Sequence, residues 1–158
     1  MSVKPLVAVA VAFACVLALA PAASAQDPTG VWKTNLAKSK YSPGPAPKSS
    51  TVTVTAVAGG GFKQVTESVS ATGAATKSEL TWMFDGKDHK VMGNPNIDTS
   101  AYTKVDAHNY TVVSKKAGKV MVTTKVQIAA DGKSRTATQS GTNAEGKPVN
   151  NVIWSDKQ

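Results

Sequence analysis

Residues 119–128 read KVMVTTKVQI, and this run decides the fold class. One parity of the run holds Val120, Val122, Thr124, Val126 and Ile128, and the other holds Met121, Thr123, Lys125 and Gln127. Successive side chains of a β-strand point to opposite faces of the sheet, so an alternation with a period of two indicates a half-buried strand. We therefore predict that the valine row faces a core and that the row with Lys125 and Gln127 faces water.

The composition around this run extends the prediction to the whole chain. Residues 26–158 contain 17 Thr and 15 Val but only two Leu. β-branched side chains suit a pleated sheet and lose rotamer freedom in helices, so this bias favours strands and excludes a helical bundle. The hydrophobic fraction of 41% is normal for a globular protein, and a segment of this length suffices for one domain but not for two.

Turn signals, most of them containing glycine, separate a series of strand-like runs at about the 8–12-residue spacing of antiparallel sheets. No helical pattern lies between the runs, so parallel pairing through crossover helices is not expected. Closure into a barrel would remove the unpaired edges of such a sheet. We predict an all-β, single-domain, up-and-down antiparallel barrel of about 8–10 short strands. The expected strands are residues 31–35, 50–57, 62–70, 78–84, 88–92, 101–106, 110–115, 119–128, 134–140 and 149–154.

The first 25 residues have the three parts of a secretory signal peptide. Lys4 supplies the positive charge, residues 6–20 form an uncharged apolar stretch, and residues 21–25 end in small side chains. The apolar stretch is shorter than the roughly 20 residues of a membrane-spanning helix, so the mature domain is expected to have no transmembrane segment. We expect cleavage before Gln26 and a periplasmic or secreted bacterial protein. The alternative makes Cys15, the one cysteine of the chain, a lipid-anchored first residue.

Gly30-Val31-Trp32 stands at the start of the first expected strand. A Gly-x-Trp motif in this position is the hallmark of lipocalins and their calycin relatives, and the chain resembles small exported bacterial lipocalin-like proteins of unassigned function. The matching stretches are residues 30–48, 85–87, 105–107 and 131–133. The resemblance implies that Gly30 and Trp32 close one end of the barrel, where an arginine of a late strand covers the indole. Arg135, the one arginine of the chain, is the candidate for this contact, and a solvated arginine at a strand edge is the alternative.

Leu80, Trp82 and Phe84 share one parity and give their strand the largest apolar area of any expected strand. Such a row must be buried, because an exposed one would promote aggregation. The inner faces of a small barrel line either a packed core or a ligand pocket. We predict that these three side chains line a ligand site and that Tyr102 and Tyr110 add hydroxyl groups to it, as in pockets with apolar walls and few polar groups. A one-residue bulge would turn either tyrosine outward.

The sequence offers no catalytic, metal-binding or cofactor motif. The histidines, His89 and His108, are too few for the roughly three or four converging ligands of a zinc site, and no cysteine follows residue 25. A nucleophile elbow, a His-Glu-x-x-His motif and a phosphate loop are all missing. The net charge of +8 predicts weak attraction to an anionic envelope surface. Specific nucleic-acid binding is not expected, because the lysines are spread evenly rather than in a stripe with stacking aromatic residues. A monomer is expected.

Two functions remain open. The first is the binding of a small apolar or amphipathic ligand inside the barrel, because medium-sized residues such as Val122, Thr124 and Val126 leave room there. The second is a structural role at the envelope surface, with a barrel filled by its own side chains and lysines that contact anionic polymers or lipids. An enzyme is a third and weaker hypothesis.

The export prediction is tested by the intact mass of the protein recovered from outside the cytoplasm. The expected mass is that of residues 26–158, because the small residues before Gln26 form a signal-peptidase site. A mass that includes residues 1–25, or an acylated terminus at Cys15, would contradict this prediction.

Overall fold

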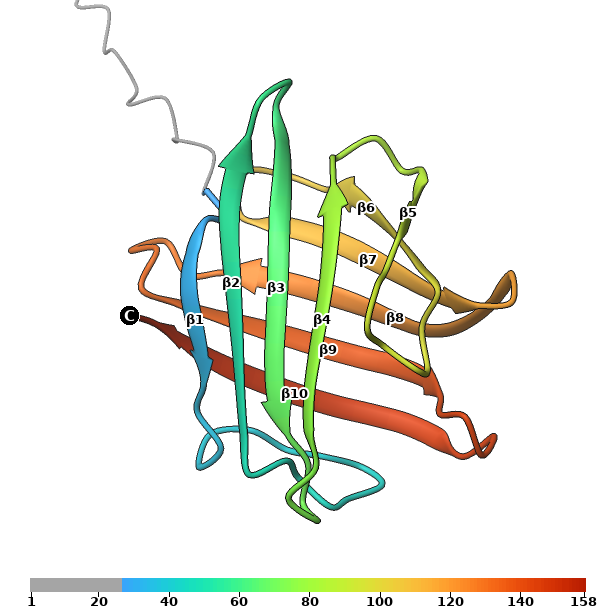
Figure 1. The fold of residues 1–158 in the computed structure, drawn as a ribbon. Coiled ribbons are helices and arrows are strands. Elements are labelled where there is room, and N and C mark those ends of the chain that lie inside the picture. The colour runs from blue at the N-terminus through green and yellow to red at the C-terminus, as the bar shows by residue number, and fades with distance from the viewer. Residues whose placement is uncertain (1–26) are drawn as a thin grey trace, which may run out of the picture.

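The computed structural model describes residues 27–158, which form ten β-strands and no helix (Figure 1). The strands are β1 (Gly30–Thr34), β2 (Ser49–Val57), β3 (Gly61–Val69), β4 (Ala75–Trp82), β5 (Asp88–Lys90), β6 (Thr99–Lys104), β7 (Asn109–Lys116), β8 (Lys119–Ile128), β9 (Ser134–Thr142) and β10 (Pro148–Lys157). Each overlaps one of the strands expected from the sequence. Nothing within the described range is a helix long and apolar enough to span a membrane. The signal-peptide prediction concerns residues outside this range.

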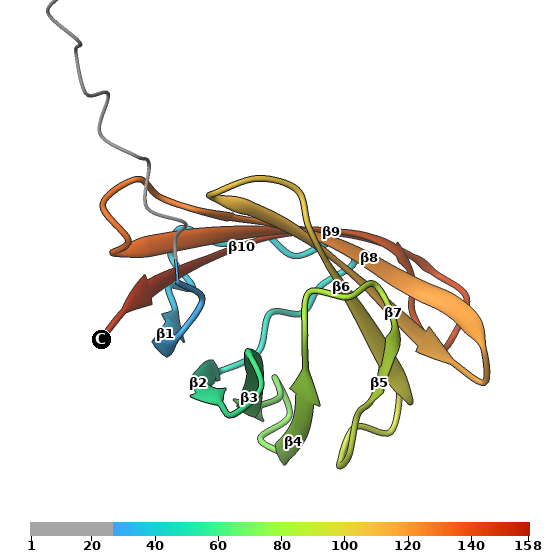
Figure 2. The same cartoon turned by 90° about the horizontal axis from the view of Figure 1, so that it is seen from above.

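The strands form one antiparallel sheet that curls into a nearly closed barrel. Their order is β4-β3-β2-β1-β10-β9-β8-β7-β6-β5. Adjacent strands are consecutive in sequence, except that β1 lies next to β10, and β4 and β5 form the two ends of the order. The sheet closes through β1 and β10, where Trp32 lies opposite Lys157 and Thr34 opposite Ser155. Seen from above, the two sides of the sheet enclose a common interior (Figure 2). The predicted all-β, up-and-down antiparallel barrel is confirmed.

The two edges of the sheet, β4 and β5, meet at a seam. Backbone pairing across the seam consists of one bridge, in which the amides of Glu79 and Met92 each donate to the carbonyl of the other at 2.9 and 2.8 Å. Beyond the end of β4, Nε2 of His89 donates to the Asp85 carboxylate at 2.9 Å. Every other pair of adjacent strands is joined by at least three paired residues. The seam is therefore the least hydrogen-bonded part of the barrel wall.

The inner face of β8 follows the predicted parity along most of its length. Thr124, Val126 and Ile128 are buried, but Val120 is 48% exposed, so the prediction that it faces the core was wrong. The cause is a β-bulge: Ser114 pairs with Val122, whereas the next residue of β7, Lys115, pairs with Val120. Met121 is thus an extra residue, and the strand changes faces beyond it.

Gly141 on β9 makes room for this bulge. It pairs with Val122 and has a φ of +152°, a conformation that other residues rarely adopt. A Cβ atom at this position would run into the carbonyl oxygen of Met121. The bulge in β8 and the glycine in β9 therefore form one local arrangement. As a result, the Val120 side chain at the start of β8 points away from the interior.

The proline-rich segment between β1 and β2 is a loop, as expected from the sequence. It is not detached, because the backbone of Lys40 pairs with that of Val152 on β10 through hydrogen bonds of 2.7 and 2.9 Å. Ser42 continues this contact by accepting from the Asn150 amide at 2.7 Å. The loop thus lies beside β10 beyond the end of β1 and leads across to β2.

The hydrophobic core includes three fully buried side chains. Trp32, Trp82 and Val54 are its largest fully buried side chains. The Trp32 indole donates from Nε1 to the Pro28 carbonyl at 2.9 Å, so its one polar group is satisfied. The Arg135 guanidinium lies over the same ring, 4.8 Å from its centroid. The contact between Trp32 and Arg135 thus links β1 to β9, which are separated in the sheet by β10.

Replacing this tryptophan tests its role in closing the barrel. Trp32→Ala should lower the free energy of unfolding by about 3–5 kcal/mol, the usual loss for a large aromatic side chain in a core. Trp154→Ala is the matched control, because Trp154 is only partly buried on β10 and should cost less. Urea denaturation followed by circular dichroism measures both. A loss below about 1 kcal/mol for Trp32→Ala would show that the ring does not hold the closed end together.

Candidate functional site: the barrel cavity

A cavity of about 400 Å³ fills the middle of the barrel. It runs from Arg135, beside the closed end, to loop residues at the opposite end, where Tyr41, Pro47, Asn94 and Ile97 line it. Its apolar wall is made of Val52, Leu80, Val91, Val112, Val122, Val126, Ala137 and Ile153. Its polar wall is made of Thr34, Ser50, Gln64, Thr66, Ser78, Ser100, Ser114, Thr124, Gln139 and Ser155. The cavity is therefore neither purely apolar nor purely polar.

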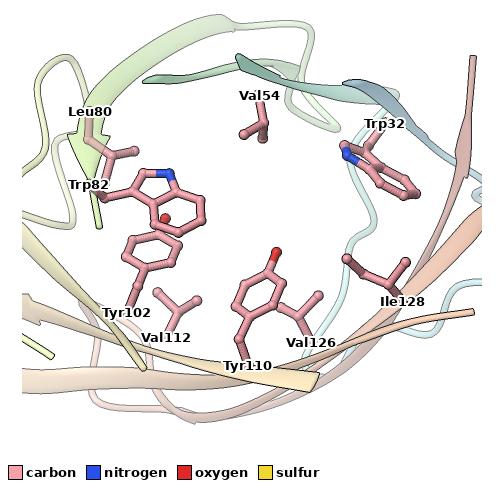
Figure 3. Close-up of a cluster of buried hydrophobic side chains, with 9 residues drawn as sticks. All are labelled: Trp32, Val54, Leu80, Trp82, Tyr102, Tyr110, Val112, Val126 and Ile128. Atoms are coloured by element: carbon pink, nitrogen blue, oxygen red, sulfur yellow. The ribbon is translucent and has the colours of Figure 1, made fainter. Parts of the chain in front are cut away.

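A group of stacked aromatic rings, Phe62, Trp82, Phe84, Tyr102 and Tyr110, lies on one side of the interior. Tyr102 lies parallel to Trp82, with ring centroids 3.9 Å apart and planes 10° apart. Phe62 packs on the same indole at 4.6 Å, and Phe84 meets it edge-on at 5.0 Å. Offset and edge-on pairs of this kind add about 0.5–1.5 kcal/mol beyond the area they bury. Figure 3 shows Tyr102 beneath Trp82 and the Tyr110 hydroxyl directed into the interior.

The five predicted ligand-site residues come together on the inner face, but they divide into two groups. Leu80, Tyr102 and Tyr110 line the cavity. Trp82 is fully buried and does not line it, and Phe84 packs beside Trp82. Phe84 also lies beyond the end of β4. Of the three residues that share one parity, Leu80 therefore lines the cavity, whereas Trp82 and Phe84 belong to the aromatic group.

The polar cavity wall was missed by reasoning from the sequence. Gln64 pairs directly with Leu80 across β3 and β4, and both side chains line the cavity. Ser100 and Ser114 face each other across β6 and β7, with their hydroxyl oxygens 3.0 Å apart. The signal that could have revealed this wall is the recurrence of Ser, Thr and Gln at positions whose parity matches a buried neighbour.

Arg135 is the most unusual side chain of the cavity. It is only 8% exposed, and it is absent from the ion pairs of the described residues. No Asp or Glu lines the cavity with it. A buried charge without a counter-ion is costly, so such residues are normally paired. The cation–π contact with Trp32 offsets part of that cost.

Tyr102 and Tyr110 keep their protons near neutral pH. Burial raises the pKa of both hydroxyls above the ordinary value of about 10. For Tyr110 the neighbouring Arg135 acts in the opposite direction, but burial outweighs it. The Tyr102 hydroxyl donates to Oε1 of Gln64 at 3.4 Å. Both tyrosines are therefore neutral hydrogen-bonding groups at the cavity wall.

The indole N–H of Trp82 is a buried donor without a hydrogen-bond partner among the described residues. An unsatisfied buried N–H costs about 1–3 kcal/mol. Trp32, the other fully buried tryptophan, does satisfy its Nε1, so the two indoles differ in this respect.

Metal binding finds no support in the arrangement of the histidines. Nε2 of His89 lies 2.9 Å from a carboxylate oxygen of Asp85, and His108 is near Asp106, whose carboxylate accepts from the His108 amide at 2.8 Å. Across residues 27–158, no three His, Cys, Asp or Glu side chains converge as a metal site would require.

Comparison with known proteins assigns no family. No family model matches the chain, and no curated protein does so significantly. The architecture is consistent with a lipocalin-like barrel, but membership of that family remains a prediction from the Gly30-x-Trp32 motif.

The buried tyrosines make the stability depend on pH above about 10. A group whose pKa is raised by folding stabilises the fold fully below its unfolded pKa, and this contribution is lost as pH rises toward the folded value. The chain has three tyrosines, and burial raises the pKa of the third, Tyr41, as well. In a spectrophotometric titration the native protein should form tyrosinate at higher pH than the urea-unfolded protein. The free energy of unfolding should fall over the same range. Coincident titration curves for the two states would contradict this prediction.

Proposed function

We propose that this protein is an exported, lipocalin-like binding protein that holds a small amphipathic molecule inside its barrel. The observation that carries the proposal is the cavity of about 400 Å³ with its mixed lining. Binding sites for small molecules typically have volumes of about 300–1,000 Å³ and combine apolar walls with a few polar groups. A single water molecule occupies about 30 Å³ of liquid, so the space is far larger than a chance packing defect.

The distribution of side-chain sizes supports a hollow interior. Of the large rings, three tyrosines (Tyr41, Tyr102 and Tyr110) line the cavity and no Phe or Trp does, and most of the remaining wall consists of medium and small residues. On β7, β8 and β9 the inward side chains include Val112, Ser114, Thr124, Val126 and Ala137. Side chains of this size reach only partway across a barrel of ten strands. The alternative of a packed barrel with a purely structural role receives no comparable support.

Filling the cavity tests the proposal. Thr124 lines the cavity, and its neighbour Thr123 on β8 has the opposite parity and does not. Thr124→Phe should occupy the binding space, whereas Thr123→Phe adds the same ring to the same strand outside the cavity. Titration with the neutral dye N-phenyl-1-naphthylamine, followed by its fluorescence, should give saturable binding to the wild type. We expect the affinity to fall at least about tenfold in Thr124→Phe and to stay unchanged in Thr123→Phe.

Circular dichroism confirms that both variants are folded before they are compared. Equal dye affinity in both variants would place the dye outside the cavity and contradict the proposal. A folded wild type that binds no dye at tens of micromolar concentration, a roughly chosen limit on the affinity scale, would also contradict it. That result would favour the second hypothesis, a packed envelope-surface protein that acts through its lysines.

A further inference from the structure

The charge inside the cavity points to the chemical class of the ligand. Arg135 supplies a permanent positive charge, because a guanidinium is not deprotonated in proteins. The cavity lining contains no carboxylate, so nothing within it neutralises this charge. By contrast, cations on the outer surface do find acidic partners: Lys115 reaches Asp88 at 2.9 Å and Lys116 reaches Asp98 at 2.8 Å.

The contact with Trp32 leaves hydrogen-bond donors of Arg135 free. A guanidinium stacks on an aromatic ring with its flat face, while its N–H groups point outward in its own plane. Cζ of Arg135 lies over the Trp32 ring, 4.8 Å from its centroid, and no N–H group of Arg135 pairs with a carboxylate of the described residues. The same ring is within 5.2 Å of a second cation, Nζ of Lys157, which does not line the cavity. Arg135 and Lys157 thus both make a cation–π contact with Trp32, but of the two only Arg135 lines the cavity.

Two residues with neutral hydroxyl groups, Ser155 and Tyr110, are neighbours of Arg135. Ser155 lies directly opposite Arg135 on β10, is 5% exposed, and lines the cavity. Tyr110 also lines the cavity, and its hydroxyl interacts with Arg135. Because neither group carries a negative charge, they can support an anion beside Arg135 without competing for it. This end of the cavity is therefore cationic and rich in donors, and Leu80, Val112 and Val126 provide apolar wall nearby.

We infer that the cavity selects amphipathic anions: Arg135 binds a single acidic group, and the apolar part of the molecule lies against Leu80, Val112 and Val126. This inference rests on the proposed binding function and specifies its ligand class. Hydrogen bonds that involve a charged group are roughly twice as strong as neutral ones, and water exclusion strengthens them further. The basic surface of the protein also raises the local concentration of anions and speeds their encounter.

Two dyes that share one ring skeleton test the inference. N-phenyl-1-naphthylamine is neutral, and 1-anilinonaphthalene-8-sulfonate is the same molecule with one sulfonate added. We expect the wild type to bind the sulfonate at least about tenfold more tightly. Arg135→Met keeps an unbranched side chain over Trp32 but removes the charge, so it should abolish this preference, measured as the ratio of the two affinities within the same variant.

Lys157→Met is the matched control, because it removes the other cation from Trp32 without changing the cavity lining. It should retain the preference for the sulfonate. Thr124→Phe should weaken both dyes, which places both of them in the cavity. If Arg135→Met does not fold, Arg135→Lys replaces it, and the preference should then fall but persist, because a lysine keeps the charge without the planar array of donors.

The outcomes separate the two proposals. If neither dye binds the wild type, the binding function itself is wrong. If both dyes bind with equal affinity, or if the sulfonate preference survives in Arg135→Met, the binding function stands and the selection of anions by Arg135 is wrong. Equal loss of the preference in Arg135→Met and Lys157→Met would also overturn the inference, because it would trace the effect to the general surface charge.

Discussion

The pairing of β1 with β10 joins the two halves of the sheet into one barrel wall around a common interior. β1 and β10 are joined by the pairs Trp32 with Lys157, Lys33 with Asp156 and Thr34 with Ser155. Without these hydrogen bonds, each half of the sheet would end in an unpaired edge and the inward side chains would face water. Closure between residues so far apart in sequence carries a large loop entropy, which must be offset by burial at the closed end. Trp32 is the residue where pairing and burial coincide.

The division of the interior follows from where the large side chains lie. Phe62 and Tyr102 both pack on Trp82, so large side chains fill this part of the barrel. The cavity wall contributes less burial and leaves a space that reduces stability relative to a filled core. A stable fold with a hollow centre therefore depends on keeping the largest apolar rings, Phe62, Trp82 and Phe84, out of the cavity wall, which Tyr102 and Tyr110 share with the aromatic group. Arg135 stands at the border, stacked on Trp32 on one side and lining the cavity on the other.

Much of this architecture can be predicted from the sequence, because strand parity and turn chemistry are local properties. The alternation in residues 119–128 gives the buried face of β8 correctly from Thr124 to Ile128. It fails at Val120, because the bulge at Met121 is made by contacts with β7 and β9 that no local pattern contains. Tyr102 and Tyr110 face the interior because their strands have no bulge before them.

The cavity is less accessible to such reasoning. Whether Leu80 and Trp82 line a void or a packed region depends on how far opposite walls stand apart, which is a property of the closed barrel. The same holds for Arg135, whose contact with Trp32 was expected from a family resemblance. Its isolation from every carboxylate could be recognised only once the positions of Asp and Glu were known. Sequence patterns indicate which side chains point inward, but the space between them is set by three-dimensional closure.

At the seam between β4 and β5, the barrel wall depends on packed side chains more than on a ladder of backbone hydrogen bonds. In a fully closed barrel the number of strands and their stagger fix the diameter, and any widening must break a complete ladder of hydrogen bonds. Here the described backbone contributes the two hydrogen bonds between Glu79 and Met92, and the stacking of Tyr102 of β6 on Trp82 of β4 joins the walls across the same seam. Segments held by so few bonds open at a lower free energy than the rest of a fold. Nine strand pairings hold the rest of the wall, whereas this seam depends on one short bridge and on the rings packed behind it.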